Sequence, residues 1–125
     1  MVDRCPVTVT GIDHVQVAGP PGCEEEARAF YGGLLGLEEL PKPEALRARG
    51  GWWVRAGAQE LHVGVEEPFA PARKAHPGLV VAGLGELAER LSAAGVEVTW
   101  DDAIPGVERI HIADPFGNRL ELRAE

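Results

Sequence analysis

Short alternating runs of apolar and polar residues predict strands along most of this chain, and two stretches show helical spacing instead. Residues 7–17 are rich in β-branched side chains and end at a Gly-Pro-Pro-Gly turn, so they predict a first strand. Residues 23–35 carry a helical apolar stripe behind three glutamates, which suit the positive end of a helix. Further strands are predicted at 37–40, 51–55 and 59–65, with a loop from 41 to about 49.

The same order of elements starts again after residues 66–74, a linker with two prolines and mixed charges. The second series consists of a strand at 76–82, a helix at 84–94, and strands at 96–100, at 107–112 and from 118 onward. We interpret this as an internal duplication within a single domain, 1–125. One module covers about 7–66 and the other about 75–125. The predicted fold class is α+β, with two tandem βαβββ modules.

Composition narrows the class of protein. A length of 125 residues fits one domain, and 45% hydrophobic residues are enough for a core. The net charge of −8 argues against a nucleic-acid or anionic-membrane binder, because both need basic surfaces. No apolar run is long enough for a membrane span, and no signal peptide is visible, so we expect a cytoplasmic protein. Two cysteines, Cys5 and Cys23, are too few for a disulfide scaffold.

The duplication pairs polar residues that look unrelated when each is taken alone. It aligns His14 with His76 at the first strands, and His62 with Glu121 at the last strands. Equivalent positions of two packed modules should converge, which would bring three imidazoles and one carboxylate to one cleft. Such ligands suit Zn, Ni, Fe(II) or Mn. A lone histidine in a strand is more often structural, but four repeat-matched residues favour a divalent metal ion.

Other residues are candidates for the same cleft by strand parity. Gln16 follows His14 on one face, and Arg109 shares a face with His111. Histidine side chains can exchange protons near neutral pH, so His111 is a candidate for proton transfer, and a plain surface histidine explains it equally well. Trp52 and Trp53 are adjacent, so one faces the cleft and the other the core. We assign the substrate-binding role to Trp52, with Gln16 and Arg109.

Several sequence stretches resemble the vicinal oxygen chelate superfamily, which includes glyoxalase I, extradiol dioxygenases, fosfomycin resistance proteins and bleomycin-binding proteins. They are residues 13–17 (Asp-His-Val-Gln-Val), 30–31 (Phe-Tyr), 34–37 (Leu-Leu-Gly-Leu), 94–96 (Ala-Gly-Val) and the closing turn and strand 114–121. The resemblance implies modules curled into a cupped mixed sheet, usually in a homodimer, with modules that can be exchanged between chains. It also implies metal ligands at His14, His76 and Glu121.

The resemblance does not select one member of the superfamily. Glyoxalase I typically has Glu where this chain has His62, a residue that often takes part in proton transfer there. The basic residues of a fosfomycin site are not evident, and the chain is half the length of a two-domain extradiol dioxygenase.

We therefore expect a metal-dependent enzyme acting on a small oxygen-chelating substrate, with His62 as fourth ligand or acid/base. Glyoxalase-type lyase or isomerase chemistry comes first and dioxygenase chemistry second. A metabolite- or drug-sequestering protein and a metal-free relic are the other interpretations.

Overall fold

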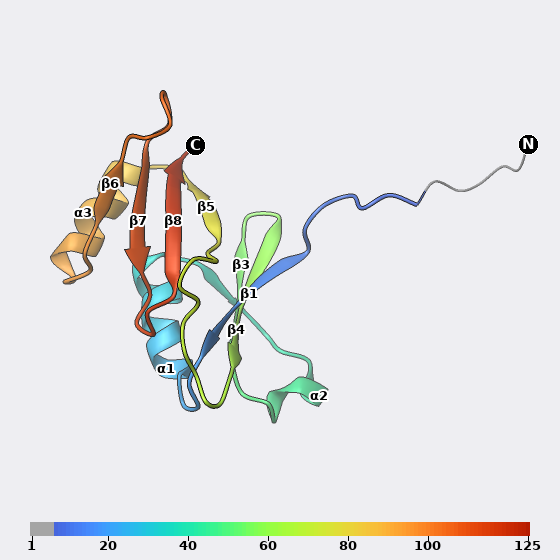
Figure 1. Ribbon diagram of the computed structural model, residues 1–125. Coiled ribbons are helices and arrows are strands. Elements are labelled where there is room, and N and C mark those ends of the chain that lie inside the picture. Colours follow the sequence, from blue (N-terminus) through green and yellow to red (C-terminus); the bar gives the residue numbers. More distant parts are fainter. Residues whose placement is uncertain (1–6) are drawn as a thin grey trace, which may run out of the picture.

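Two four-stranded sheets share one core in the computed structural model, which describes residues 7–125 (Figure 1). The strand orders are β1-β4-β3-β2 and β5-β8-β7-β6. In each sheet the first strand of the module pairs in parallel with the last, and the other pairs are antiparallel. The strands are β1 (His14–Gly19), β2 (Glu38–Leu40), β3 (Trp52–Ala56), β4 (Gln59–Val65), β5 (Gly78–Val81), β6 (Thr99–Asp101), β7 (Arg109–Ala113) and β8 (Arg119–Ala124). The predicted α+β class and its two βαβββ modules are confirmed.

Two helical segments pack their apolar stripes into the core. The first begins as α1 (Glu24–Ala27) and continues as the π-helical η1 (Arg28–Leu34), where the Leu35 amide donates to the Phe30 carbonyl five residues back at 3.0 Å. The second is α3 (Leu84–Ala93). Their buried side chains recur at helical spacing: Ala27, Phe30, Tyr31, Leu84, Leu87, Ala88 and Leu91. Both helical segments end at a glycine with positive φ, Gly36 at 72° and Gly95 at 87°.

Strand register shows the internal symmetry residue by residue. Gln16 of β1 lies opposite His62 of β4, and Gly78 of β5 lies opposite Glu121 of β8. His14 lies two positions before Gln16, and His76 lies two positions before Gly78. The duplication therefore places His62 and Glu121 at equivalent points of the two sheets.

The predicted elements differ from the structure in two places. The first strand was predicted from residue 7, but β1 begins only at His14, because its partner β4 begins at Gln59 and gives the earlier residues nothing to pair with. The predicted loop after residue 41 contains a short helix, α2 (Glu44–Arg47). The other boundaries shift by a few residues at most.

The turn at residues 114–118 joins the two modules. The Asp114 carboxylate accepts hydrogen bonds from the Phe116 and Asn118 amides at 2.9 and 2.8 Å and from the Tyr31 hydroxyl at 2.7 Å. The Asn118 side-chain amide donates to the Ala18 carbonyl at 2.7 Å. Burial, together with the charge of Asp114, raises the pKa of Tyr31. One buried network thus fixes the start of β8 against η1 and β1.

No helix among residues 7–125 combines the length and apolar character needed to cross a bilayer. Cys23 is buried as a free thiol, and Cys5 lies outside the described residues.

Candidate functional site

A stack of three rings lies on the polar face of the first sheet. The Trp53 and His62 rings are parallel within 2° at a centroid distance of 3.9 Å, and His14 stacks on His62 at 4.4 Å. The contact follows from the register, because Trp53 lies directly across from His62. Although His62 is on the polar face, only 5% of it is exposed. The stack therefore fixes the plane of the His62 imidazole.

Carboxylates contact both histidines of this face. Glu60 Oε1 lies 2.9 Å from His62 Nε2, and Asp13 Oδ2 lies 2.9 Å from His14 Nδ1. A carboxylate partner favours a proton on the contacted ring nitrogen, which leaves a lone pair on the other nitrogen. This is the arrangement in which histidines usually bind metals. The first sheet thus offers two nitrogen donors, and we name His14 and His62 the first half-site.

Gln16 lies beside this half-site because Gly64 leaves room for it. A Cβ atom added at Gly64 would lie 2.6 Å from Gln16 Nε2. The Gln16 side chain therefore lies across the β4 backbone on the same face as His62. Its amide can donate to and accept from a ligand there.

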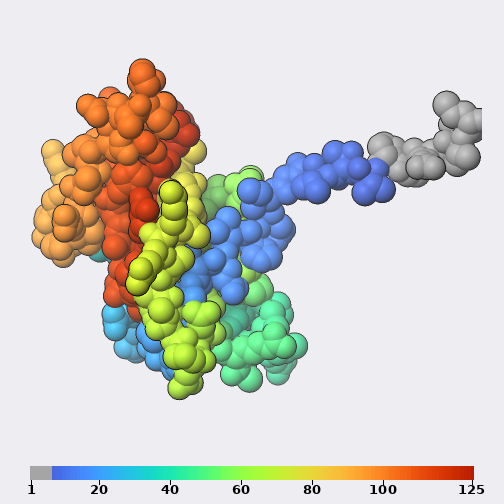
Figure 2. Space-filling model, viewed as in Figure 1, coloured from blue at the N-terminus to red at the C-terminus, as the bar shows by residue number. Residues whose placement is uncertain are grey.

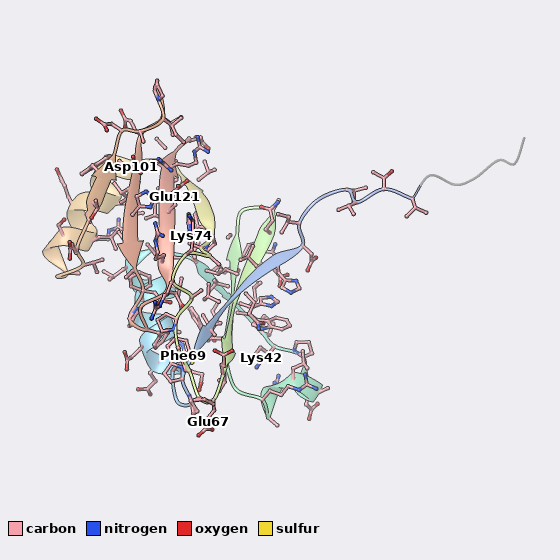
Figure 3. The ribbon with its side chains drawn as sticks, in the orientation of Figure 1. Lys42, Glu67, Phe69, Lys74, Asp101 and Glu121 are labelled. Carbon is pink, nitrogen blue, oxygen red and sulfur yellow. The ribbon has the colours of Figure 1, made fainter. Side chains whose placement is uncertain are left out.

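A charged network spans β6, β7 and β8 on the polar face of the second sheet. Arg109 donates to Glu121 Oε1 at 2.6 Å, and its other terminal nitrogen lies 2.9 Å from Asp101 Oδ2. The same Asp101 oxygen lies 2.8 Å from His111 Nε2. Asp101 and Glu121 thus lie on the same sheet, two strands apart (Figure 3). His76 Nδ1 lies 2.8 Å from the Lys74 carbonyl oxygen. We name His76 and Glu121, the positions that the repeat matches with His14 and His62, the second half-site, and Arg109 holds its Glu121.

Hydrogen bonds stabilise the charged form of the Asp101 carboxyl group. The Ala103 amide, then the His111 ring, then the positive charge of Arg109 lower the pKa of this carboxyl. Among residues 7–125, Arg109 Nε and His111 Nδ1 are buried without a hydrogen-bond partner. Trp52 Nε1 and Glu24 Oε2 are unpaired as well in this part of the chain, and Arg109 Nε and His111 Nδ1 are the two unpaired atoms of the network that holds Glu121.

The two half-sites do not meet within one chain. No three His, Cys, Asp or Glu side chains of residues 7–125 lie close enough together to hold a metal ion. The reason is the shared core: Leu61 of β4 and Leu122 of β8 both point into it, so the alternate residues His62 and Glu121 both point away from it. Within one copy of residues 7–125, the candidate ligands His14, His62, His76 and Glu121 therefore do not form one metal site.

Comparison with known proteins decides the family. No family model matches this chain, and no curated protein matches it. A Bacillus anthracis protein assigned to the glyoxalase family is 52% identical, and the alignment covers 97% of this chain and 99% of that one with a TM-score of 0.92. The chain belongs to the vicinal oxygen chelate superfamily.

Two more distant members of the superfamily have the same fold. A lactoylglutathione lyase from Agrobacterium tumefaciens is 20% identical over 93% of this chain and 94% of its own length, with a TM-score of 0.72. A fosfomycin resistance protein from Listeria monocytogenes is 16% identical over 94% of this chain and 95% of its own length, with a TM-score of 0.76. The fold is thus shared by superfamily members with different names and activities.

The structure places the two tryptophans and brings in two residues that the sequence did not single out. Trp52, expected to bind substrate, is only 4% exposed and packs in the core, whereas Trp53 stacks on His62 at the polar face. Parity indicates this, since Trp53 alternates with the buried Val54. Asp101 and Glu60 were not singled out from the sequence. Their contacts depend on strand pairing and side-chain direction, which composition and spacing do not specify.

Proposed function

We propose that this protein is a metal-dependent enzyme of the vicinal oxygen chelate superfamily whose complete site is shared between two copies of the chain. The first half-site of one copy would face the second half-site of the other. The observation that carries this proposal is the matched register of the half-sites on two outward-facing sheet surfaces. Each half-site supplies two donors, which is too few for a site that needs at least three.

The combined donor set fits a divalent ion. His14 and His62 of one copy, with His76 and Glu121 of the other, give three imidazoles and one carboxylate. This set suits Zn, Ni, Fe(II) or Mn. An ion bound there would act as a Lewis acid on two adjacent oxygens of a small substrate.

Residues beside the half-sites have roles that follow from their contacts. The Trp53 ring forms an apolar wall against which a small substrate can pack. Arg109 orients Glu121 by a charge-assisted hydrogen bond, and its unpaired Nε is a donor available to a substrate oxygen. Asp101 orients the His111 ring through Nε2, so Nδ1 is the atom that would hold or release a proton.

Lyase or isomerase chemistry of the glyoxalase type is the reaction class we propose, with dioxygenase chemistry second. These reactions need a group that polarises two adjacent oxygens of the substrate and a nearby proton acceptor. The two half-sites and the residues beside them together offer candidates for both roles. A screen across hemithioacetals, catechols, acyl-CoAs and fosfomycin with several metals would identify the substrate.

A binding protein without turnover is the second candidate, and one observation favours it. Glu121 is already engaged by Arg109 at 2.6 Å, which is a complete ion pair without a metal. The flat stack of Trp53, His62 and His14 would suit a planar or cationic ligand held in the cleft of a dimer.

Complementation between two variants tests the shared site directly. His14→Ala and Glu121→Ala, each made without a His tag, should bind no stoichiometric metal alone. When they are mixed and allowed to exchange subunits, each mixed dimer regains one intact site, because one copy keeps the first half-site and the other keeps the second. The mixture should recover about a quarter of the wild-type metal content, since half the dimers are mixed and each has one of two sites intact.

The outcomes separate the proposals. His14→Ala mixed with itself is the control and should recover nothing. A metal-loaded wild type with no recovery in the mixture would place the site within one chain. A wild type that binds no metal after dialysis against each of the four ions would overturn the enzyme proposal and favour the binding protein.

A further inference from the structure

Residues 7–12 form an extended arm that runs outward from β1 (Figures 1 and 2), and its base, Gly11 and Ile12, borders a cavity of its own molecule. Their sequence, Val-Thr-Val-Thr-Gly-Ile, alternates β-branched apolar and polar side chains as a half-buried strand does. Yet Val7 is 101% exposed, Val9 90% and Ile12 65%. A strand-like sequence with its apolar face in solvent indicates a missing partner.

The arm has no pairing partner among residues 7–125. Its last backbone contact with the first sheet is the Glu60 amide donating to the Asp13 carbonyl at 3.1 Å. Just before Glu60, the chain turns at Gly57, which has a φ of 62°. The arm therefore extends beyond the end of β4, where the first sheet has no strand left to pair with it.

Strand β5 offers an unprotected edge of the kind that such an arm needs. It is the first strand of the second sheet, and within the described part of the chain it pairs with β8 alone. Its sequence, Gly-Leu-Val-Val, has no charged residue, and Val80 is 66% exposed. Natural edge strands usually carry charges, bulges or proline that prevent pairing with other chains. An apolar edge without these features is expected to be covered.

An apolar cavity beside this edge needs an occupant. It has a volume of about 1330 Å³ and lies between β1 and β5. Its walls are mainly aliphatic, including Val15, Val17, Leu61, Leu79, Val81 and Leu122. This cavity opens to solvent, so its apolar walls form a surface that a second chain can cover.

We propose that residues 7–12 of one copy add to β5 of a second copy as an extra strand, with Val7 and Val9 packed against Val80 and the mouth of the cavity. Six extended residues span roughly 20 Å, longer than the roughly 13 Å of the four-residue β5. The arm leaves its own molecule pointing outward, which favours a second copy over its own β5 (Figure 1). The proposal concerns the contact between copies and is independent of any metal or reaction.

Alternation within the arm provides a matched pair of variants. Val7→Lys with Val9→Lys should raise the dimer dissociation constant about 10- to 100-fold, because it removes two buried valines from the contact. Thr8→Lys with Thr10→Lys adds the same charge on the other face and should change it by less than about threefold. Sedimentation over a range of concentrations measures both. Equal effects of the two double variants would overturn the proposal.

Two further measurements locate the arm. Its backbone amides at 8–12 should exchange slowly with deuterium at concentrations where the dimer forms, and rapidly after dilution. In a Cys5→Ser background, Val9→Cys on one copy and Val80→Cys on an isotope-labelled copy should cross-link between the two copies. Rapid deuterium exchange of the arm amides at every protein concentration would contradict the proposed strand addition. So would a cross-link that forms only within one chain when Val9→Cys and Val80→Cys are combined in the same chain. Neither outcome bears on the metal complementation.

Discussion

Neighbouring residues of one strand can have entirely different roles, as the two tryptophans of β3 show. Trp52 is 4% exposed and its indole packs so closely on Gly32 that an added Cβ there would lie 3.1 Å from it. Trp53 points the other way and stacks on His62. The first is part of the core and the second is part of the candidate site, although one peptide bond separates them.

This difference gives a prediction at the scale of single residues. Trp52→Ala should lower the free energy of unfolding by about 3–5 kcal/mol, the usual cost of removing a large buried ring. Trp53→Ala should cost less than about 2 kcal/mol but weaken binding of ligand at the first half-site. Urea denaturation of both variants measures the first effect and calorimetric titration the second. A larger loss of stability in Trp53→Ala than in Trp52→Ala would contradict the assignment of Trp52 to the core.

The sequence pattern of helix α3 agrees closely with its structure. Its predicted stripe is buried as a whole, and Leu91 is fully buried near its end. The amphipathic period alone determines which face packs, so no long-range information is needed.

The burial of Leu91 leads to a prediction at the scale of the element. Leu91→Ala should lower the free energy of unfolding by about 2–5 kcal/mol through lost burial and a residual cavity. Glu89 lies on the exposed face of α3, so Glu89→Ala should change it by less than about 0.5 kcal/mol. Thermal and urea unfolding of the two variants are the measurement. Similar losses in both would contradict the packing of α3.

How far sequence predicts an element depends on where its partner lies. Strand 59–65 was predicted with its observed bounds, since alternation and the turn before it are local. Residues 7–13 were predicted as strand for the same local reason, yet they lack one because β4 begins too late to pair with them. The ion pair of Arg109 with Asp101 depends on the pairing of β6 with β7, which no local pattern specifies. The candidate ligands followed from the repeat, whereas their separation on two outward faces followed only from the shared core.

At the scale of the whole molecule, the buried contact between Tyr31 and Asp114 joins the modules across 83 positions of sequence. Tyr31 is the only tyrosine of the chain, so its ionisation can be followed alone by phenolate absorbance. The contact therefore reports on the docking of the two modules.

The raised pKa of Tyr31 predicts a loss of stability in alkali. The folded protein keeps the phenol proton above about pH 10, where an unfolded tyrosine loses it. The stabilisation is thus complete below about pH 10 and declines as the pH rises, by up to about 1.4 kcal/mol per pH unit. Urea denaturation at a series of pH values should show this slope in the wild type. In Tyr31→Phe the slope should be shallower by that amount, and an unchanged slope would contradict the prediction.

The outward direction of both polar faces has a kinetic consequence. If neither copy carries a whole site, catalysis is a property of the encounter between two copies and of the fraction of chains that are paired. Below the dissociation constant that fraction falls with concentration, so the rate would follow the square of the amount of protein rather than the amount itself. Turnover per molecule would then depend on how abundant the protein is, and a cell could silence the activity simply by making less of the chain.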